Sequence, residues 1–96
     1  MFEIRIDEDA HEFLLSLPPK SQKIIKENLS KLETNPFPGN SGDKEKLDLP
    51  LDPPVYRMHI GRSYTVFYTI DIERQIVYID ILTTIEQAHK FYGRYG

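Results

Sequence analysis

The residues whose types and spacing could do chemistry are concentrated in one predicted β-hairpin, residues 55–70. Arg57 and His59 are two positions apart, so an extended strand points both side chains to the same face. Arg62 follows in the glycine-containing turn of this hairpin. A fixed guanidinium beside a titratable imidazole suits a phosphate-rich ligand. The alternative is that both are ordinary solvent-facing strand residues, with Arg57 in a cross-strand ion pair, for example with Asp80.

Composition limits the classes of function that are open to this chain. Its 96 residues predict a single domain, residues 1–96, large enough to bury a modest core. Because the chain has no cysteine, disulfides and cysteine-based metal sites are excluded. The three histidines are far apart and lack metal-ligand spacing, so we expect no metal and no cofactor. The formal net charge of −3 disfavours nucleic-acid binding through overall charge, so such binding needs a local basic patch.

Apolar runs in the chain are short. Charges interrupt the first residues, Met1–Asp7, so we do not expect a signal peptide there. No run is long enough to cross a bilayer, and no membrane partner is expected. Together with the absence of cysteine, these features predict a cytoplasmic protein.

The first half of the chain predicts a strand and two helices that would support the hairpin. Phe2–Ile6 alternates apolar and charged residues, which is typical of a half-buried strand. A helix follows, capped by Asp7 or Asp9, and the Pro18-Pro19 pair ends it. A second helix is expected from about residue 19 to 33. The short connector predicts that the two helices form an antiparallel hairpin.

The second half predicts a β-meander. A proline-rich loop, residues 35–54, carries Lys44 and Lys46 and leads into it. Strands are expected at Val55–Ile60, Ser63–Ile70 and Gln75–Leu82. In the last strand, alternation places Val77, Ile79 and Ile81 on one face. A short helix is expected over residues 84–95. The predicted fold class is α+β, an antiparallel four-stranded sheet packed on an N-terminal helical hairpin, in the order β-α-α-β-β-β with a short C-terminal helix.

The hairpin also carries a family resemblance. The residues that match are Tyr56, Arg57, Gly61, Tyr64 and Tyr68, in a family pattern that reads roughly Tyr-Arg-Leu-Arg-Val-Gly-x-Tyr-Arg-Val-Ile-Tyr. With the order of elements over nearly the whole chain, this pattern resembles the RelE/ParE superfamily of toxins from toxin–antitoxin pairs. The resemblance implies a small toxin that an antitoxin holds inactive. RelE-type members cleave mRNA in the ribosomal A site without a metal, whereas ParE-type members share the fold and poison DNA gyrase.

The resemblance implies roles for individual residues. Arg57 would contact phosphate or stabilise transition-state charge, and His59 would act as general acid or base. Tyr92 would stack on a base or orient the reacting ribose. The candidate catalytic residues are Arg57, His59, Arg62 and Tyr92, and the candidate substrate-binding residues are Lys44, Lys46, Tyr64 and His89.

Two departures from the family pattern leave the function open. Thr65 stands where the family usually has an arginine, and Thr83-Thr84-Ile85-Glu86 replaces a basic stretch after the last strand. Arg62 could substitute for the missing cation, and His89 for a terminal base. One hypothesis is therefore a ribosome-dependent mRNA interferase with a partly degenerate site. The alternatives are a catalytically weak or inactive toxin-fold protein, or a ParE-like gyrase inhibitor, acting through protein binding. The partners expected are an antitoxin and, for an active enzyme, ribosome and mRNA; self-association is a further expectation.

Overall fold

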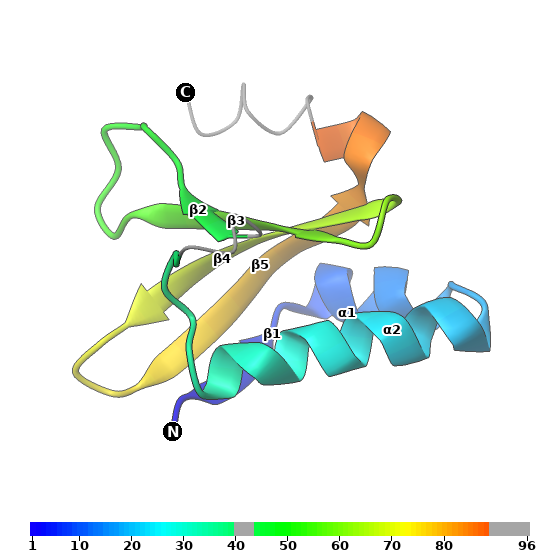
Figure 1. Ribbon diagram of the computed structural model, residues 1–96, viewed down its shortest axis with the longest axis horizontal. Helices are drawn as coiled ribbons and strands as arrows, with labels where there is room; N and C mark the ends of the chain where they lie inside the picture. The colour runs from blue at the N-terminus through cyan, green and yellow to red at the C-terminus, as the bar shows by residue number, and fades with distance from the viewer. Residues whose placement is uncertain (40–43, 89–96) are drawn as a thin grey trace.

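The computed structural model describes residues 1–39 and 44–88 (Figure 1). Within these ranges the elements are β1 (Glu3–Ile6), α1 (Glu8–Leu15), α2 (Pro19–Ser30), the 3-10 turn η1 (Lys31–Glu33), β2 (Lys44–Lys46), β3 (Val55–Ile60), β4 (Tyr64–Asp71) and β5 (Ile76–Thr84). Residues 85–88 continue as helix. The α+β class and most predicted elements are confirmed. The rest of the C-terminal helix expected over residues 84–95 lies outside the described residues.

The sheet has five strands in the described ranges, in the order β1-β5-β4-β3-β2, rather than the four antiparallel strands predicted. β3, β4 and β5 form the expected antiparallel meander, but β1 pairs parallel to β5. The helical hairpin lies between β1 and the meander, and such a crossover allows a parallel arrangement. The added strand, β2, pairs antiparallel with β3. It is anchored by Leu47, which is buried and whose backbone N–H donates to the Val55 carbonyl at 2.9 Å.

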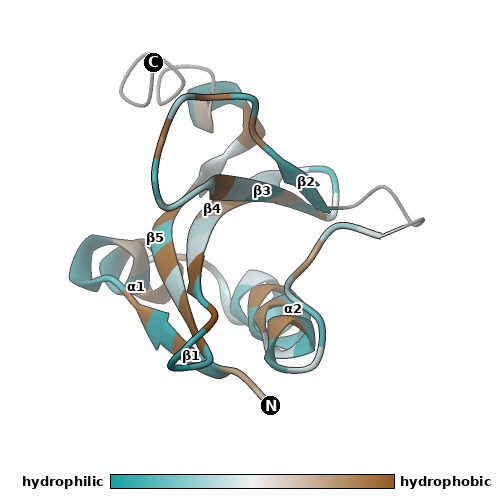
Figure 2. Ribbon diagram, turned by 90° about the vertical axis from the view of Figure 1, so that its left-hand side faces the viewer, coloured by the Kyte–Doolittle hydropathy of each residue, from teal (hydrophilic) through white to brown (hydrophobic). Residues whose placement is uncertain are grey.

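The two helices pack against one face of the sheet, which we call the helix face. Asp7 is the N-cap of α1, and its carboxylate accepts from the Asp9 backbone N–H at 3.1 Å. Pro19 begins α2, where its missing N–H costs no helical bond. The principal core combines residues of both helices and of β3–β5, including Leu14, Ile25, Leu29, Met58, Val66, Tyr68 and Ile79. Figure 1 shows both helices below the strands, and Figure 2 shows how the sheet twists from β3 towards β1.

A β-bulge in β5 corrects the predicted faces of that strand. Phe67 pairs with Ile81 and the next residue, Tyr68, pairs with Ile79, so Asp80 has no opposite residue on β4. One extra residue in a strand reverses the alternation beyond it. Ile81 therefore packs on the opposite side from Ile79, contrary to the sequence prediction, and Leu82 joins the principal core in its place.

The opposite side of the sheet, which we call the outer face, is partly covered. A second cluster there joins Leu47, Val55, Phe67 and Ala88, with Leu49, Leu51 and Ile81 packed against it. This cluster holds the segment after β2 and residues 85–88 against the sheet. No helix of the described residues is long and apolar enough to cross a membrane.

Candidate functional site

Arg57 and His59 lie together on the outer face, at the middle of β3. Their neighbours Tyr56, Met58 and Ile60 belong to the core on the helix face, whereas Val55 belongs to the outer-face cluster. The two-residue spacing thus has the geometry expected of a strand. The Arg57 side chain is only 21% exposed.

Arg57 forms an ion pair with Glu45, a residue that the sequence did not single out. Glu45 pairs directly with Arg57 between β2 and β3, and its carboxylate accepts a hydrogen bond from the guanidinium Nη2. The partner considered from sequence, Asp80, lies on β5, which β4 separates from β3. The sequence allows a brief turn or strand over residues 44–49, but nothing local shows that it pairs with β3 and so brings Glu45 to Arg57.

His59 is held by a buried hydroxyl. Its ring Nδ1 lies 3.0 Å from the Oγ1 of Thr65, the residue opposite it on β4. The Thr65 side chain is 0% exposed, while His59 is exposed. The contact fixes the imidazole through Nδ1 and leaves Nε2 as the nitrogen available to an outside partner. Thr65, which replaces the arginine of the family pattern, therefore positions the neighbouring imidazole.

Arg62 lies beyond these residues, in the turn between β3 and β4. With Ser63, Thr84, Ile85 and Glu86 it lines an open cavity of about 470 Å³ at this end of the sheet. The Ile85 backbone N–H donates to the Ser63 carbonyl at 2.9 Å, which ties the end of β5 to the turn. Arg57, His59 and Arg62 therefore follow one another along one hairpin, and we call them the cationic end of the outer face.

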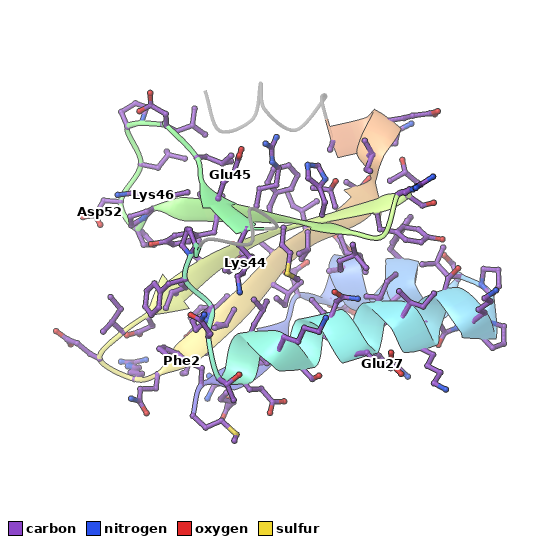
Figure 3. The ribbon with its side chains drawn as sticks, viewed as in Figure 1. Phe2, Glu27, Lys44, Glu45, Lys46 and Asp52 are labelled. Atoms are coloured by element: carbon purple, nitrogen blue, oxygen red, sulfur yellow. The ribbon has the colours of Figure 1, made fainter. Side chains whose placement is uncertain are left out.

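Three other sequence candidates lie away from this cationic end. The Lys44 Nζ donates to the Asn35 carbonyl at 3.0 Å, and Lys46 is opposite Tyr56 of the helix-face core. Figure 3 shows Lys44 and Glu45 pointing to opposite sides of β2. The Tyr64 hydroxyl donates to the Ser21 Oγ at 3.2 Å on the helix face. The structure does not bring these three residues to Arg57, so Tyr64 has a packing role here.

The remaining candidates, His89 and Tyr92, lie outside the described residues. In residues 1–39 and 44–88, no group of three or more histidine, cysteine, aspartate or glutamate side chains is arranged to hold a metal ion.

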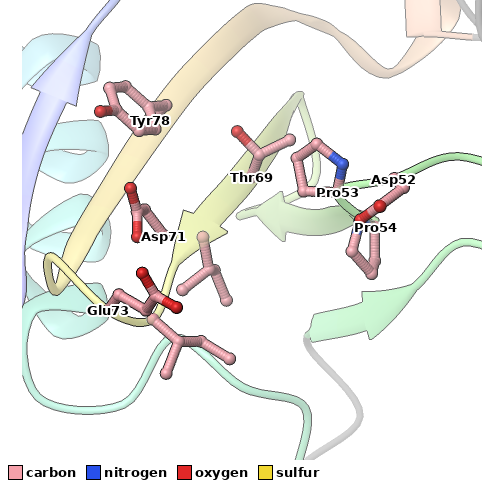
Figure 4. Close-up of a pocket in the computed structure, with 9 residues that line it drawn as sticks. Asp52, Pro53, Pro54, Thr69, Asp71, Glu73 and Tyr78 are labelled. Carbon is pink, nitrogen blue, oxygen red and sulfur yellow. The ribbon is translucent and has the colours of Figure 1, made fainter.

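The other end of the outer face is acidic. Near the β4–β5 turn, a cavity of about 430 Å³ is lined by Asp52, Asp71, Glu73 and Tyr78, among others (Figure 4). Asp80 lies on the neighbouring part of β5, and burial raises the pKa of its carboxyl above the usual value, while a hydrogen bond from Thr69 partly offsets this. Carboxylates repel phosphates, so this end of the outer face disfavours a polyanionic ligand.

Comparison with known proteins decides the family. A model of the ParE toxin of the type II toxin–antitoxin system parDE matches residues 4–87. The chain belongs to the RelE/ParE superfamily of toxins. A relative from Methanocaldococcus jannaschii, which carries the toxin name RelE1, is 33% identical over 92 residues, covering 93% of this chain and 96% of that protein.

Solved structures show the same fold. The archaeal RelE–RelB complex from Pyrococcus horikoshii contains a chain that is 26% identical, with a TM-score of 0.73, over 86% of this chain and 93% of that chain. The RelBE2 toxin–antitoxin complex of Mycobacterium tuberculosis gives 23% identity and a TM-score of 0.71, over 86% and 96% of the two chains. The isolated E. coli RelE toxin is 17% identical, with a TM-score of 0.70, over 98% of both chains. The predicted superfamily and RelE-like fold are thereby confirmed.

Proposed function

We propose that this type II toxin is a RelE-like endonuclease that cleaves ribosome-bound mRNA without a metal. The observation that carries the proposal is the placement of Arg57 and His59 on one face, with the imidazole held by Thr65. A phosphodiester needs a cation at its non-bridging oxygens and a proton acceptor at the attacking hydroxyl. The cationic end of the outer face supplies both.

The reaction would be an attack of the RNA on itself. Nε2 of neutral His59 takes the proton of a ribose 2′-hydroxyl, and the 2′-oxygen forms a bond to the adjacent phosphorus. The bond from phosphorus to the 5′-oxygen breaks, and that oxygen takes a proton from water. The products are a 2′,3′-cyclic phosphate and a 5′-hydroxyl. Arg57 stabilises the charge that develops on the phosphoryl oxygens.

Glu45 sets a condition on this reaction. Its carboxylate accepts a hydrogen bond from the Arg57 guanidinium in the structure. An RNA phosphate must therefore displace the carboxylate or share the guanidinium with it. Glu45 is 54% exposed, and exposed ion pairs contribute only about 0–1 kcal/mol, so a phosphate can compete. Arg62, with its neighbouring cavity, would contact the nucleotide beyond the scissile bond.

A programmed-ribosome assay tests the proposal. Purified toxin is mixed with ribosomes carrying a defined message, and new RNA ends are mapped by primer extension. Arg57→Ala should lower the single-turnover rate about 10²–10³-fold, the usual cost of losing one charge-stabilising donor. The matched control is Arg74→Ala, because Arg74 is an exposed cation at the acidic end, where its guanidinium lies 3.9 Å from Asp71. An intact message with wild-type toxin would overturn the proposal.

Specific observations also favour a second candidate, a toxin that acts only through protein binding. The matching family model is that of ParE toxins, Thr65 replaces an arginine, and Arg57 is engaged by Glu45. This candidate predicts growth arrest without new RNA ends, and inhibition of DNA gyrase in a supercoiling assay. A catalytically decayed member would arrest nothing yet still bind its antitoxin.

The partner proposed under either candidate is a cognate antitoxin. Support comes from two relatives, those of Pyrococcus horikoshii and Mycobacterium tuberculosis, which were solved in complex with their antitoxins. Co-expression with the protein encoded beside this toxin should give a complex that co-purifies and suppresses growth arrest. Self-association stays a prediction, and size-exclusion chromatography of the toxin alone over a range of concentrations tests it.

A further inference from the structure

An arginine and a glutamate line one cavity at the end of the sheet without forming an ion pair with each other. This is the cavity of about 470 Å³ near the β3–β4 turn, lined by Arg62, Ser63, Thr84, Ile85 and Glu86. Arg62 and Glu86 are both exposed. No salt bridge within residues 1–39 and 44–88 includes either of them. The cavity therefore offers a ligand one guanidinium and one carboxylate.

Hydrogen bonds on both sides of Glu86 fix its backbone beside the turn. The Ile85 N–H donates to the Ser63 carbonyl at 2.9 Å, and the Thr84 Oγ1 accepts from the Gln87 N–H at 3.2 Å. Figure 1 shows the β3–β4 turn beside the end of β5, where the helical residues 85–88 begin. The carboxylate and the turn that carries Arg62 therefore keep their places relative to each other.

The cavity lies next to the proposed cleavage site. His59 is opposite Thr65 on β4, and Thr65 is opposite Thr83 on β5, directly before the cavity residues. Neighbouring strands are about 4.8 Å apart, so Thr83 lies roughly 10 Å from His59 across the sheet. A single RNA strand with its reacting ribose at His59 can therefore place a neighbouring nucleotide in the cavity. Its volume also falls within the range of about 300–1,000 Å³ that is typical of small-ligand sites.

The charges of the cavity match a nucleotide with a particular base. Arg62 is suited to the phosphate, and the half-buried Ile85 offers an apolar surface to a base. An ionised carboxylate only accepts hydrogen bonds, through two oxygens. Guanine has two adjacent donors, N1–H and the N2 amino group, on its Watson–Crick edge. Adenine and cytosine place a ring acceptor beside their amino group, and uracil places its N–H between two carbonyls.

We propose that this cavity is the subsite for the base that follows the cleaved bond, and that Glu86 selects guanine there. Unstacked bases of single-stranded RNA are commonly read by hydrogen bonds to this edge. The inference rests on the proposed cleavage, because the subsite is defined by the position of the reacting phosphate at Arg57 and His59. It gives Glu86 the role of a specificity-determining residue for that reaction.

Programmed ribosomes test the selection with four messages that differ only in the base after the mapped cleavage point. Wild-type toxin should cleave the guanine message about 10–100-fold faster than the adenine message, the discrimination that a bidentate contact to a base provides. A fifth message with inosine at this point keeps N1–H and lacks the amino group. Its rate should lie between those of guanine and adenine.

Glu86→Gln separates the contribution of the toxin from that of the ribosome. An amide presents one acceptor and one donor, which match the N6 amino group and N1 of adenine. The ratio of guanine to adenine cleavage should therefore fall at least about tenfold, towards a preference for adenine. The matched control is Glu73→Gln, the same change at an exposed glutamate of the acidic end, and it should keep the wild-type ratio.

A binding measurement gives a readout that needs no cleavage. Two labelled RNA heptamers, made of 2′-O-methyl uridine with a central guanosine or adenosine, cannot be cut, because the attacking hydroxyl is blocked. By fluorescence anisotropy at low salt, wild-type toxin should bind the guanosine probe about tenfold more tightly, and Glu86→Gln should lose this preference. Arg62→Gln should weaken both probes alike, because a phosphate contact carries no sequence information.

The outcomes distinguish this inference from the proposed cleavage. Equal cleavage of all messages, or a guanine preference that persists in Glu86→Gln, would overturn the inference and leave the cleavage standing. If wild-type toxin cuts no message, the proposed cleavage fails and the heptamers decide the inference. Equal affinity of wild-type toxin for the two heptamers would then overturn it, and a guanosine preference that depends on Glu86 would support it.

Discussion

The two ends of the outer face differ in charge although they lie on the same three strands. The end near the β3–β4 turn presents Arg57, His59 and Arg62. The end near the β4–β5 turn presents Asp52, Asp71 and Glu73 around an open cavity. Under the proposed function, a phosphate would be attracted to the first end and repelled by the second, so the contrast would orient RNA along the sheet more strongly than cations alone would.

The two ends also differ in how their charged groups are held. At the cationic end, Arg57 is paired with Glu45 and His59 with a fully buried threonine hydroxyl. At the acidic end, the Asp71 carboxylate lies 3.9 Å from the guanidinium of the exposed Arg74 and accepts a hydrogen bond from the Arg74 backbone N–H. Groups that side-chain contacts hold in a fixed geometry suit chemistry. This difference favours the cationic end as the reactive site.

Among the variants that test this contrast, His59→Ala should have the largest effect on the cleavage rate. Removal of the proton acceptor should lower single-turnover cleavage on programmed ribosomes about 10²–10⁴-fold, the usual contribution of general acid–base catalysis. Asp71→Asn, at the acidic end, should stay close to the wild-type rate. Equal losses in both variants would show that the two ends do not differ in function.

A smaller effect is expected from Thr65→Val, which keeps the shape of the side chain and removes the hydroxyl that contacts His59 Nδ1. Cleavage should fall about fivefold, which corresponds to the roughly 1 kcal/mol of a typical hydrogen bond. The tautomer of His59, read from the ¹⁵N chemical shifts of its ring, should become mixed. Thr65→Ser should keep both the wild-type rate and the wild-type tautomer of His59. If the tautomer were unchanged in Thr65→Val, Thr65 would not position His59.

Glu45→Gln should not weaken function but should modestly strengthen the binding of RNA. Without the carboxylate, Arg57 no longer has an anion that competes with phosphate, so affinity for a short single-stranded RNA at low salt should rise up to about fivefold, as expected for an exposed ion pair. Glu3→Gln is the matched control, because it breaks the exposed ion pair with Arg5 on a distant strand. Weaker binding in Glu45→Gln would instead mean that Glu45 holds Arg57 in its binding orientation.

The smallest effect concerns the pH dependence of stability at Asp80. Burial raises the folded-state pKa of this carboxyl above its ordinary value of 3.8, so ionisation disfavours the folded state. The penalty is present above the folded pKa and disappears as pH falls towards the unfolded pKa. Asp80→Asn should therefore raise Tm at pH 7 by a few degrees at most, about the effect of less than 1 kcal/mol, and the gain should vanish near pH 3.

Sequence periodicity was most successful where contacts are local. The predicted bounds of β3, Val55–Ile60, are those of the structure, and helical structure extends from Pro19 to Glu33 through α2 and η1. The prediction that Arg57 and His59 share a face also needed only the two-residue repeat of a strand. The same two-residue repeat gave the wrong face for Ile81, because the bulge at Asp80 depends on how β5 pairs with β4. The sequence of one strand does not show its register with a partner strand.

The sequence by itself determined the class of fold, the superfamily and the pairing of a guanidinium with an imidazole on one strand. The fold class and the paired side chains follow from residue type and from a repeat that is local along the chain, whereas the superfamily follows from a resemblance in the hairpin residues. Only the tertiary structure decided that Glu45 meets Arg57, that Thr65 holds His59, and that Lys44 and Tyr64 face away from them. The physical reason is that strand pairing and sheet faces are set by contacts between residues far apart in the chain, which the burial of two separate apolar clusters selects.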